Sequence, residues 1–163
     1  MCCIALIELL GRWAWHDRDV AIIALLHGPN LNLLGQREPQ IYGSSTLEDY
    51  VETVTRAAAG HGHSVEAMQT NHEGALVDAI HAARNHAAAI IINPGAFTHY
   101  AWAIHDALAA FEGPIIEVHI SNPNAREPWR HTSVVAPVAT GSIIGLGIHG
   151  YELAVNAIAV KLA

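Results

Sequence analysis

Short apolar runs alternate with longer segments of helical spacing along most of this chain, and this alternation restricts its fold more than any other feature. The runs are rich in the β-branched residues that are typical of buried strands. Parallel strands need helical crossovers, so the alternation favours an α/β protein. We therefore predict a flavodoxin-like doubly wound sheet of five parallel strands with helices on both faces. The expected strands are Val20–Leu26, Ser64–Thr70, Ala88–Ile92, Ile115–Ile120 and Val134–Ala139.

Four segments of helical spacing lie between and after these runs. A capping box of Ser45 and Glu48 predicts the start of the first helix, and Gly60 is well placed to end it. In the third helix, Trp102, Ile104 and Leu108 are available for burial. The expected helices run from Thr46 to Gly60, from Glu73 to Arg84, from Thr98 or His99 to about Phe111, and from roughly Ile148 to Leu162.

The loops that follow the strands are the expected place for a ligand. In a parallel sheet these loops gather at one edge, where ligands bind. The loops at residues 27–43, 93–99 and 119–130 should therefore converge. The first is long for a connection between a strand and a helix, and Gly35 and Gly43 flank an arginine and a tyrosine within it. These are the parts of a lid.

Tyr42 lies five residues after Arg37 in this first loop. A nearby cation favours the phenolate over the phenol, so Tyr42 is a candidate general base with Arg37 as its partner. The alternative is that Tyr42 is a partly buried anchor, which is the usual role of a tyrosine in a loop.

Glu117 and His119 are two residues apart on an expected strand, so both side chains should point to the same face. His119 then lies at the carboxyl end, where Glu117 can fix the tautomer of its imidazole and make it a proton donor. Ser121 adds a hydroxyl and a backbone amide at the start of the next loop. The alternative for His119 is a satisfied, partly buried side chain without a catalytic role.

Two of the eight cationic side chains, Arg126 and Arg130, lie within five residues of each other in an acidic protein. Guanidinium groups suit carboxylates and phosphates, so this pair predicts a local anion site. The alternative is a solvated surface pair. Asn93 and His99 flank an expected helix start, whose backbone amides also favour an anionic or hydroxyl-rich ligand.

The composition favours one soluble domain. The chain has 163 residues, of which 52% are hydrophobic and 14% charged, and its net charge of −7 argues against binding to nucleic acid or to an anionic membrane. We expect residues 1–19 to be an N-terminal extension outside the fold and residues 20–163 to form a single catalytic domain. A cytoplasmic location is expected, because the adjacent Cys2 and Cys3 give no disulfide framework.

Several kinds of chemistry find no support in the sequence. Lys161 is the only lysine and lies near the end of the last helix, so Schiff-base catalysis has no plausible nucleophile. The pairs His61 with His63 and His81 with His86 lack the spacing of a zinc helix. Glycine-rich nucleotide-binding motifs are also missing after the first strand. We therefore expect neither a metal site nor a dinucleotide or nucleoside triphosphate site.

Five motifs, taken together and in order, resemble those of type II 3-dehydroquinate dehydratase. The likeness extends from Val20 to about Leu162, and the segment Gly145–Tyr151 is similar to the start of the family's last helix. The motifs are His27-Gly-Pro-Asn-Leu-Asn-Leu-Leu-Gly-Gln-Arg-Glu-Pro-Gln-Ile-Tyr-Gly43, Asn71-His-Glu-Gly74, Ile92-Asn-Pro-Gly-Ala-Phe-Thr-His99, Glu117-Val-His-Ile-Ser-Asn122 and Ala125-Arg-Glu-Pro-Trp-Arg-His131.

This resemblance implies a cofactor-free anti elimination of water from 3-dehydroquinate, through an enolate, to give 3-dehydroshikimate. It implies that Tyr42 removes the C2 proton and that Arg37 holds Tyr42 as a phenolate. Asn30 would position a water on the enolate oxygen. His119 would donate a proton to the departing C1 hydroxyl.

The resemblance also implies how the substrate is held. Asn93, His99 and Arg130 would bind the ring hydroxyls, and the backbone of Ile120 and Ser121 would take the carboxylate.

The family's assembly is a homododecamer built from trimers, in which an aspartate reaches into the neighbour's site. That aspartate corresponds to Asp106. Residues 100–105 differ from the more usual family residues, so the expected third helix is changed next to this aspartate.

Two other functions stay open at this stage. A flavodoxin-like binding or signalling module would use the same sheet, but it would need a phosphate-binding loop or paired acidic residues after the first strand. A non-catalytic descendant of the family would keep Asn93 and Arg130 without needing both Tyr42 and His119. The sequence also leaves open whether the reaction serves aromatic biosynthesis or quinate breakdown, since both use it.

Overall fold

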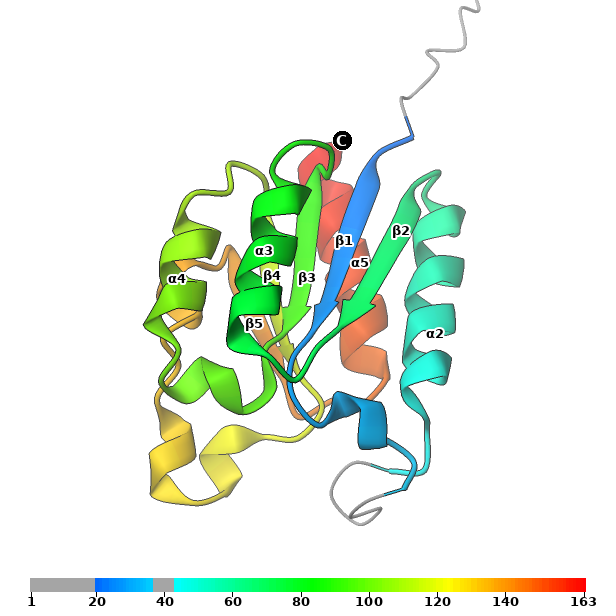
Figure 1. Cartoon of the computed structure of the whole chain (residues 1–163). Coiled ribbons are helices and arrows are strands. Elements are labelled where there is room, and N and C mark those ends of the chain that lie inside the picture. Colours follow the sequence, from blue (N-terminus) through cyan, green and yellow to red (C-terminus); the bar gives the residue numbers. More distant parts are fainter. Residues whose placement is uncertain (1–19, 37–42) are drawn as a thin grey trace, which may run out of the picture.

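The computed structural model describes residues 20–36 and 43–163, and these form a five-stranded, fully parallel sheet (Figure 1). The strand order β2-β1-β3-β4-β5 is that of a flavodoxin-like doubly wound fold, which confirms the predicted fold class. The strands are β1 (Ile22–His27), β2 (Ser64–Gln69), β3 (Ala89–Asn93), β4 (Ile115–His119) and β5 (Gly141–Ile144).

Two helices cover each face of the sheet (Figure 1). Helices α2 (Leu47–Gly60) and α5 (His149–Leu162) pack on one face, and α3 (Glu73–Ala83) and α4 (Trp102–Ala109) on the other. Strand β1 supplies both cores, because successive side chains of a strand alternate between its faces. Ile23 and Leu25 pack toward α2 and α5, whereas Ala24 and Leu26 pack toward α3 and α4.

Helix α2 begins one residue later than the sequence predicted. The side chain of Thr46 accepts from the Asp49 amide, and the Asp49 carboxylate accepts from the Thr46 amide. The expected capping box of Ser45 and Glu48 is therefore wrong in register, because the backbone is still extended at Thr46 (φ −81°, ψ 167°). The helix ends at Gly60, as predicted, and the first left-handed residue after it is Gly62 (φ +80°).

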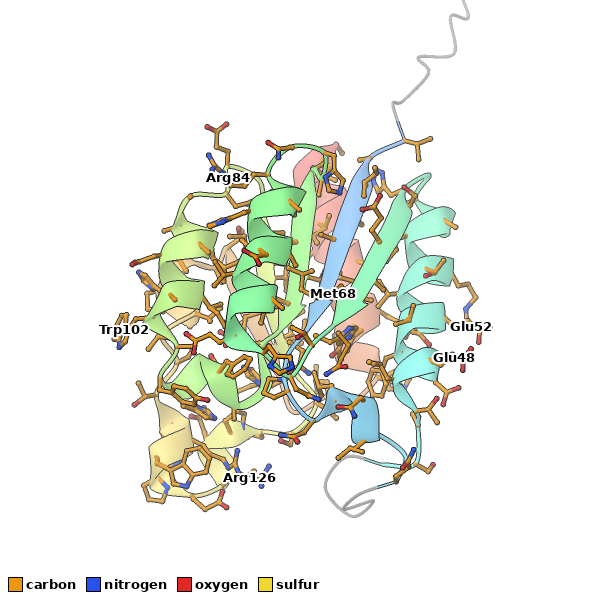
Figure 2. All side chains as sticks on the ribbon, viewed as in Figure 1. Glu48, Glu52, Met68, Arg84, Trp102 and Arg126 are labelled. Carbon is orange, nitrogen blue, oxygen red and sulfur yellow. The ribbon has the colours of Figure 1, made fainter. Side chains whose placement is uncertain are left out.

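The expected third helix is divided into two parts. Gly95–His99 forms a short 3₁₀ turn, the chain bends at Tyr100, and α4 begins only at Trp102. This register directs Ile104 and Leu108 into the core and leaves Trp102 62% exposed, so its expected burial is wrong. Figure 2 shows Trp102 projecting away from the fold.

The fifth strand lies later in the chain than predicted. Val134 and Val135 are buried against the α4 side of the sheet, but Ala136–Val138 form a 3₁₀ turn and β5 starts at Gly141. Pro137 explains the difference, because proline has no N–H to donate to a strand ladder. The apolar character of Val134 and Val135 reflects burial without strand pairing.

Among the described residues, no helix is long and apolar enough to cross a membrane.

Candidate active site

The loops that follow β1, β3 and β4 line one pocket of about 260 Å³ at the carboxyl edge of the sheet. The pocket lies beside the point between β1 and β3 at which the strand order reverses, where doubly wound sheets bind ligands. Figure 1 shows these loops gathered at one end of the strands. Eight residues predicted for the site line this pocket: Asn30, Asn93, His99, His119, Ile120, Ser121, Arg126 and Arg130.

The other three predicted residues are not in this pocket. Tyr42 and Arg37 lie outside the described residues. Asp106 lies on α4, its side chain is exposed, and it does not line the pocket of its own chain.

Asn30 is held in an unusual backbone conformation at the mouth of the pocket. Its φ of +65° is left-handed, a region in which asparagine is better tolerated than most residues. The backbone N–H of Asn30 donates to Oδ1 of Asn71 (2.8 Å), and Gln69 Nε2 donates to the same oxygen (3.1 Å). The end of β2 therefore fixes the loop that carries Asn30.

Gly28 allows the first two loops to meet. A Cβ at this position would lie 2.3 Å from the carbonyl oxygen of Pro94, so any larger residue would push the loops apart. The Gly28 N–H also donates to the carbonyl of Asn93 (2.8 Å). A glycine is therefore needed here for the close approach of the β1 and β3 loops.

Asn93 is the buried polar residue at the end of β3, with 3% of its surface exposed. Its Nδ2 donates to the hydroxyl of Tyr151 on α5 (2.9 Å), and its Oδ1 accepts from the Gly95 N–H (3.1 Å). The carboxamide is therefore held on both sides while it lines the pocket.

Glu117 and His119 form the predicted pair on β4. His119 Nε2 lies 2.8 Å from Oε1 of Glu117, so the ring donates this hydrogen to the carboxylate. Glu117 is only 1% exposed, and it also accepts from three hydroxyls. These belong to Thr98 (2.5 Å), Ser133 (3.1 Å to Oε1 and 3.2 Å to Oε2) and Ser142 (3.2 Å).

These donors decide the charge of Glu117. Burial alone would raise the pKa of Glu117, but the hydrogen bond and charge of His119 oppose it, together with the hydroxyls of Thr98 and Ser133. The net effect lowers the pKa of Glu117 below its ordinary value. Glu117 is therefore a buried carboxylate, and it orients His119 at the pocket wall.

The loop after β4 forms a further wall of the pocket. Arg130 Nε donates to Oε2 of Glu127 (2.8 Å), and Arg126 Nε lies 3.6 Å from the same oxygen. The Arg130 guanidinium also lies 4.0 Å from the ring centre of Trp129. Arg126 lies among the loops at the carboxyl end of the sheet (Figure 2). Trp129 and Glu127 thus hold Arg130 beside the pocket.

His99 connects this wall to the β3 loop. Its Nδ1 donates to the carbonyl of Thr132 (2.8 Å), and the edge of its ring meets Trp129 at a centroid distance of 5.2 Å. Burial lowers the pKa of His99, and the positive charges of His119 and Arg130 lower it further. His99 is therefore mainly neutral at pH 7, and its free Nε2 can accept a hydrogen bond.

The sequence pointed to residues that line the pocket and missed several that hold them. Thr98, Ser133 and Ser142 reach Glu117 from three separate segments, so local patterns gave no signal for them. Glu127 and Arg130 are three residues apart, a spacing that can predict their ion pair. In residues 20–36 and 43–163, no three His, Cys, Asp or Glu side chains are grouped as ligands for a metal ion.

Comparison with known proteins decides the family. The family model described as Dehydroquinase class II matches residues 21–159. The chain belongs to the class II dehydroquinase family. The 3-dehydroquinate dehydratase of Halalkalibacterium halodurans is 53% identical to this chain over 136 residues, which cover 83% of this chain and 94% of the relative.

Two further matches agree with this family. The catabolic 3-dehydroquinase of Emericella nidulans is 56% identical over 139 residues, covering 85% of this chain and 91% of the relative. The crystal structure of type II dehydroquinase from Propionibacterium acnes is similar with a TM-score of 0.82 and 47% identity, covering 85% of this chain and 96% of that one.

Proposed function

We propose that this protein is a type II 3-dehydroquinate dehydratase, a hydro-lyase that converts 3-dehydroquinate into 3-dehydroshikimate without a cofactor. The observation that carries this proposal is His119, which is hydrogen-bonded to the buried Glu117 and lines the same pocket as Asn93 and Arg130. An oriented proton donor thus lies beside groups that bind hydroxyls and anions. This arrangement suits the elimination of water from a polyhydroxylated cyclic acid.

Proton removal is assigned to Tyr42. In this proposal the phenolate of Tyr42, held by Arg37, takes the C2 proton of the substrate, and the electrons of that C–H bond form the enolate. Asn30 positions a water that donates to the enolate oxygen and so stabilises the charge. Asn30 lines the pocket and belongs to the connection between β1 and α2, in which Tyr42 follows it in the sequence. This location supports the role proposed for Asn30.

Proton delivery is assigned to His119. Collapse of the enolate breaks the C1–O bond, and His119 protonates the leaving hydroxyl so that it departs as water. Because His119 Nε2 is occupied by Glu117, Nδ1 is the ring nitrogen left to face a ligand. The ionised Glu117 stabilises the protonated ring from which the proton is delivered.

Substrate binding uses both walls of the pocket. Asn93, His99 and Arg130 bind ring hydroxyls, while the backbone of Ile120 and Ser121 takes the carboxylate. The overall charge of −7 makes a local cationic wall necessary for an anionic substrate. Arg130, fixed by Glu127 and Trp129, meets this need at the β4 loop.

The proposed assembly is a cytoplasmic homododecamer built from trimers. Asp106 would extend from α4 into the site of a neighbouring subunit. Its exposure and its absence from the pocket of its own chain support this placement. The exposed Trp102 lies on the same helix, so the changed residues before Asp106 would lie near that contact.

The direct test is to add 3-dehydroquinate to the purified full chain in EDTA and to follow the ultraviolet absorbance of the conjugated enone. A parallel sample receives borohydride in the presence of substrate, which would trap an imine. We expect a rise in absorbance that neither treatment changes. Binding of substrate without any rise would contradict the proposal and favour a non-catalytic member of the family.

A further inference from the structure

We propose that Tyr151 is a positioning residue that turns the carboxamide of Asn93 so that an N–H group is offered to the ligand. The inference rests on the proposed function only for the identity of that ligand. Tyr151 belongs to α5 and does not line the pocket, so it acts through Asn93 and not on the substrate.

The orientation of the Asn93 carboxamide follows from its two partners. The backbone N–H of Gly95 can only donate, so the atom that it meets at 3.1 Å must be the carbonyl oxygen of the side chain. The NH₂ group therefore faces the Tyr151 hydroxyl at 2.9 Å. One of its two N–H bonds is used by Tyr151, and the other is the donor left for a ligand.

Tyr151 is itself held firmly. Its side chain is completely buried, stacks on His27 with ring centres 5.7 Å apart, and meets the edge of Tyr50 at 5.0 Å. His27 pairs with Asn93 across the β1–β3 ladder, so the stacked ring lies at the same level of the sheet as the carboxamide. Tyr151 therefore cannot turn away from Asn93 without disturbing the core.

The phenol of Tyr151 remains neutral in this setting. Burial raises the pKa of Tyr151, and the hydrogen bond from Asn93 offsets only part of that shift. A neutral hydroxyl accepts from Asn93 without placing a charge behind the pocket. The pocket therefore presents a fixed hydrogen-bond donor at Asn93. A ligand must place an oxygen that can accept a hydrogen bond at this position.

Two tyrosines provide a matched pair of variants. Tyr151→Phe removes only the hydroxyl that holds Asn93, whereas Tyr50→Phe removes a hydroxyl from the neighbouring buried ring on α2. For Tyr151→Phe we expect KM for 3-dehydroquinate to rise about tenfold, with kcat changed by less than about threefold, because a contact made equally in ground and transition states is weakened. For Tyr50→Phe both constants should stay within about twofold of wild type. Thermal unfolding verifies that both variants fold.

A double variant separates positioning from a general effect on the fold. If Tyr151 acts through Asn93, then adding Tyr151→Phe to Asn93→Ala should change kcat/KM by less than about twofold. A further loss of tenfold in the double variant would overturn the inference, as would equal kinetics for Tyr151→Phe and wild type.

The two proposals can fail separately. If the wild type does not turn over 3-dehydroquinate, the proposed function fails, and calorimetric binding of 3-dehydroshikimate to the same variants decides the role of Tyr151. We then expect about tenfold weaker binding by Tyr151→Phe alone. Unchanged binding, or no binding by the wild type, would overturn the inference.

Discussion

Two glutamates hold side chains that line the pocket, Glu117 holding His119 and Glu127 holding Arg130, and they do so in different surroundings. Glu117 is 1% exposed and accepts from His119 and three hydroxyls, whereas the side chain of Glu127 is 52% exposed and accepts from Arg130. Both carboxyl groups have a lowered pKa. The pKa of Glu127 is lowered by hydrogen bonds from its own backbone N–H and from Arg130, whereas at Glu117 the hydrogen-bond donors outweigh the opposing effect of burial.

The difference between the two glutamates is one of energetic cost. A buried carboxylate is stable only if hydrogen-bond donors replace the water that it has lost. Removal of any one donor should therefore lower the free energy of unfolding strongly. An exposed ion pair is screened by salt and solvent, so it contributes little. The β4 wall should therefore control turnover and stability, and the loop wall should control substrate affinity.

The largest effect should come from the residue that Glu117 orients. His119→Ala removes the proposed acid, and we expect turnover to fall by roughly two to four orders of magnitude. The exposed His149 at the start of α5 provides the control, because His149→Ala should leave turnover within about twofold. Steady-state kinetics measure both. Retained activity in His119→Ala would contradict the role of His119 as the catalytic acid.

His27 is a buried titratable side chain without the hydrogen-bond partners that surround Glu117. It is 1% exposed, and neither ring nitrogen has a hydrogen-bond partner among the described residues. Burial lowers the pKa of His27 from 6.5 to about 4, and the nearby backbone of Met68 offsets this only in part. Unlike Glu117, it is therefore neutral in the folded protein at pH 7.

This difference gives a test of stability against pH. The unfolded chain protonates His27 near pH 6.5 but the folded protein does so only near pH 4, so the unfolded state binds more protons between these values. The free energy of unfolding should thus fall by about 3 kcal/mol from pH 6.5 to pH 4 through His27 alone. Urea unfolding of His27→Phe should show a profile flatter by that amount, and parallel profiles would contradict the pKa of about 4.

Replacing Glu117 should affect stability in a lower pH range. Glu117→Gln puts an NH₂ group among hydrogen-bond donors, where the carboxylate oxygen had been the acceptor. We expect this to lower the free energy of unfolding by about 1–3 kcal/mol at pH 7. Because the folded pKa of Glu117 is lowered, its contribution is present above pH 4.5 and is lost as the pH falls through that lowered pKa. Urea unfolding should therefore show the two proteins converging in strong acid. A constant difference at every pH would show that the charge of Glu117 does not matter.

The smallest effect should come from the exposed glutamate. Glu127→Gln loosens Arg130 but leaves Trp129 beneath its guanidinium, so we expect KM to rise about two- to fivefold at low salt. The difference from wild type should shrink as the salt concentration rises. Kinetics at two ionic strengths measure this. A large rise in KM that salt does not reduce would contradict the view that Glu127 forms a weak, solvent-screened ion pair.

The sequence predicted those parts of the site that depend on local rules. Parallel strands place Asn93 and His119 at one edge of the sheet, and the two-residue spacing of Glu117 and His119 puts both on one face. The clustered arginines and the expected helix start pointed to Arg130 and His99, and the motif resemblance supplied Asn30 and Ile120. The placement of these residues followed without knowledge of any long-range contact.

What the sequence did not predict depends on long-range packing. Ser142 reaches Glu117 only because β5 pairs with β4, and the buried Val134 and Val135 had been interpreted as that strand. The contact between Tyr151 and Asn93 joins residues 58 positions apart. Neither contact leaves a periodic pattern in the sequence. The register of α2 was missed for a simpler reason, since Ser45 and Thr46 are both good caps.

The most direct test of this account compares kcat for Glu117→Gln and Glu127→Gln in the same assay. We predict that Glu117→Gln loses about ten- to a hundredfold in kcat, the value of a hydrogen bond to a charged group, while Glu127→Gln stays within about threefold of wild type. Equal losses in the two variants, or full kcat in Glu117→Gln, would contradict the claim that the buried carboxylate on β4 controls the chemistry.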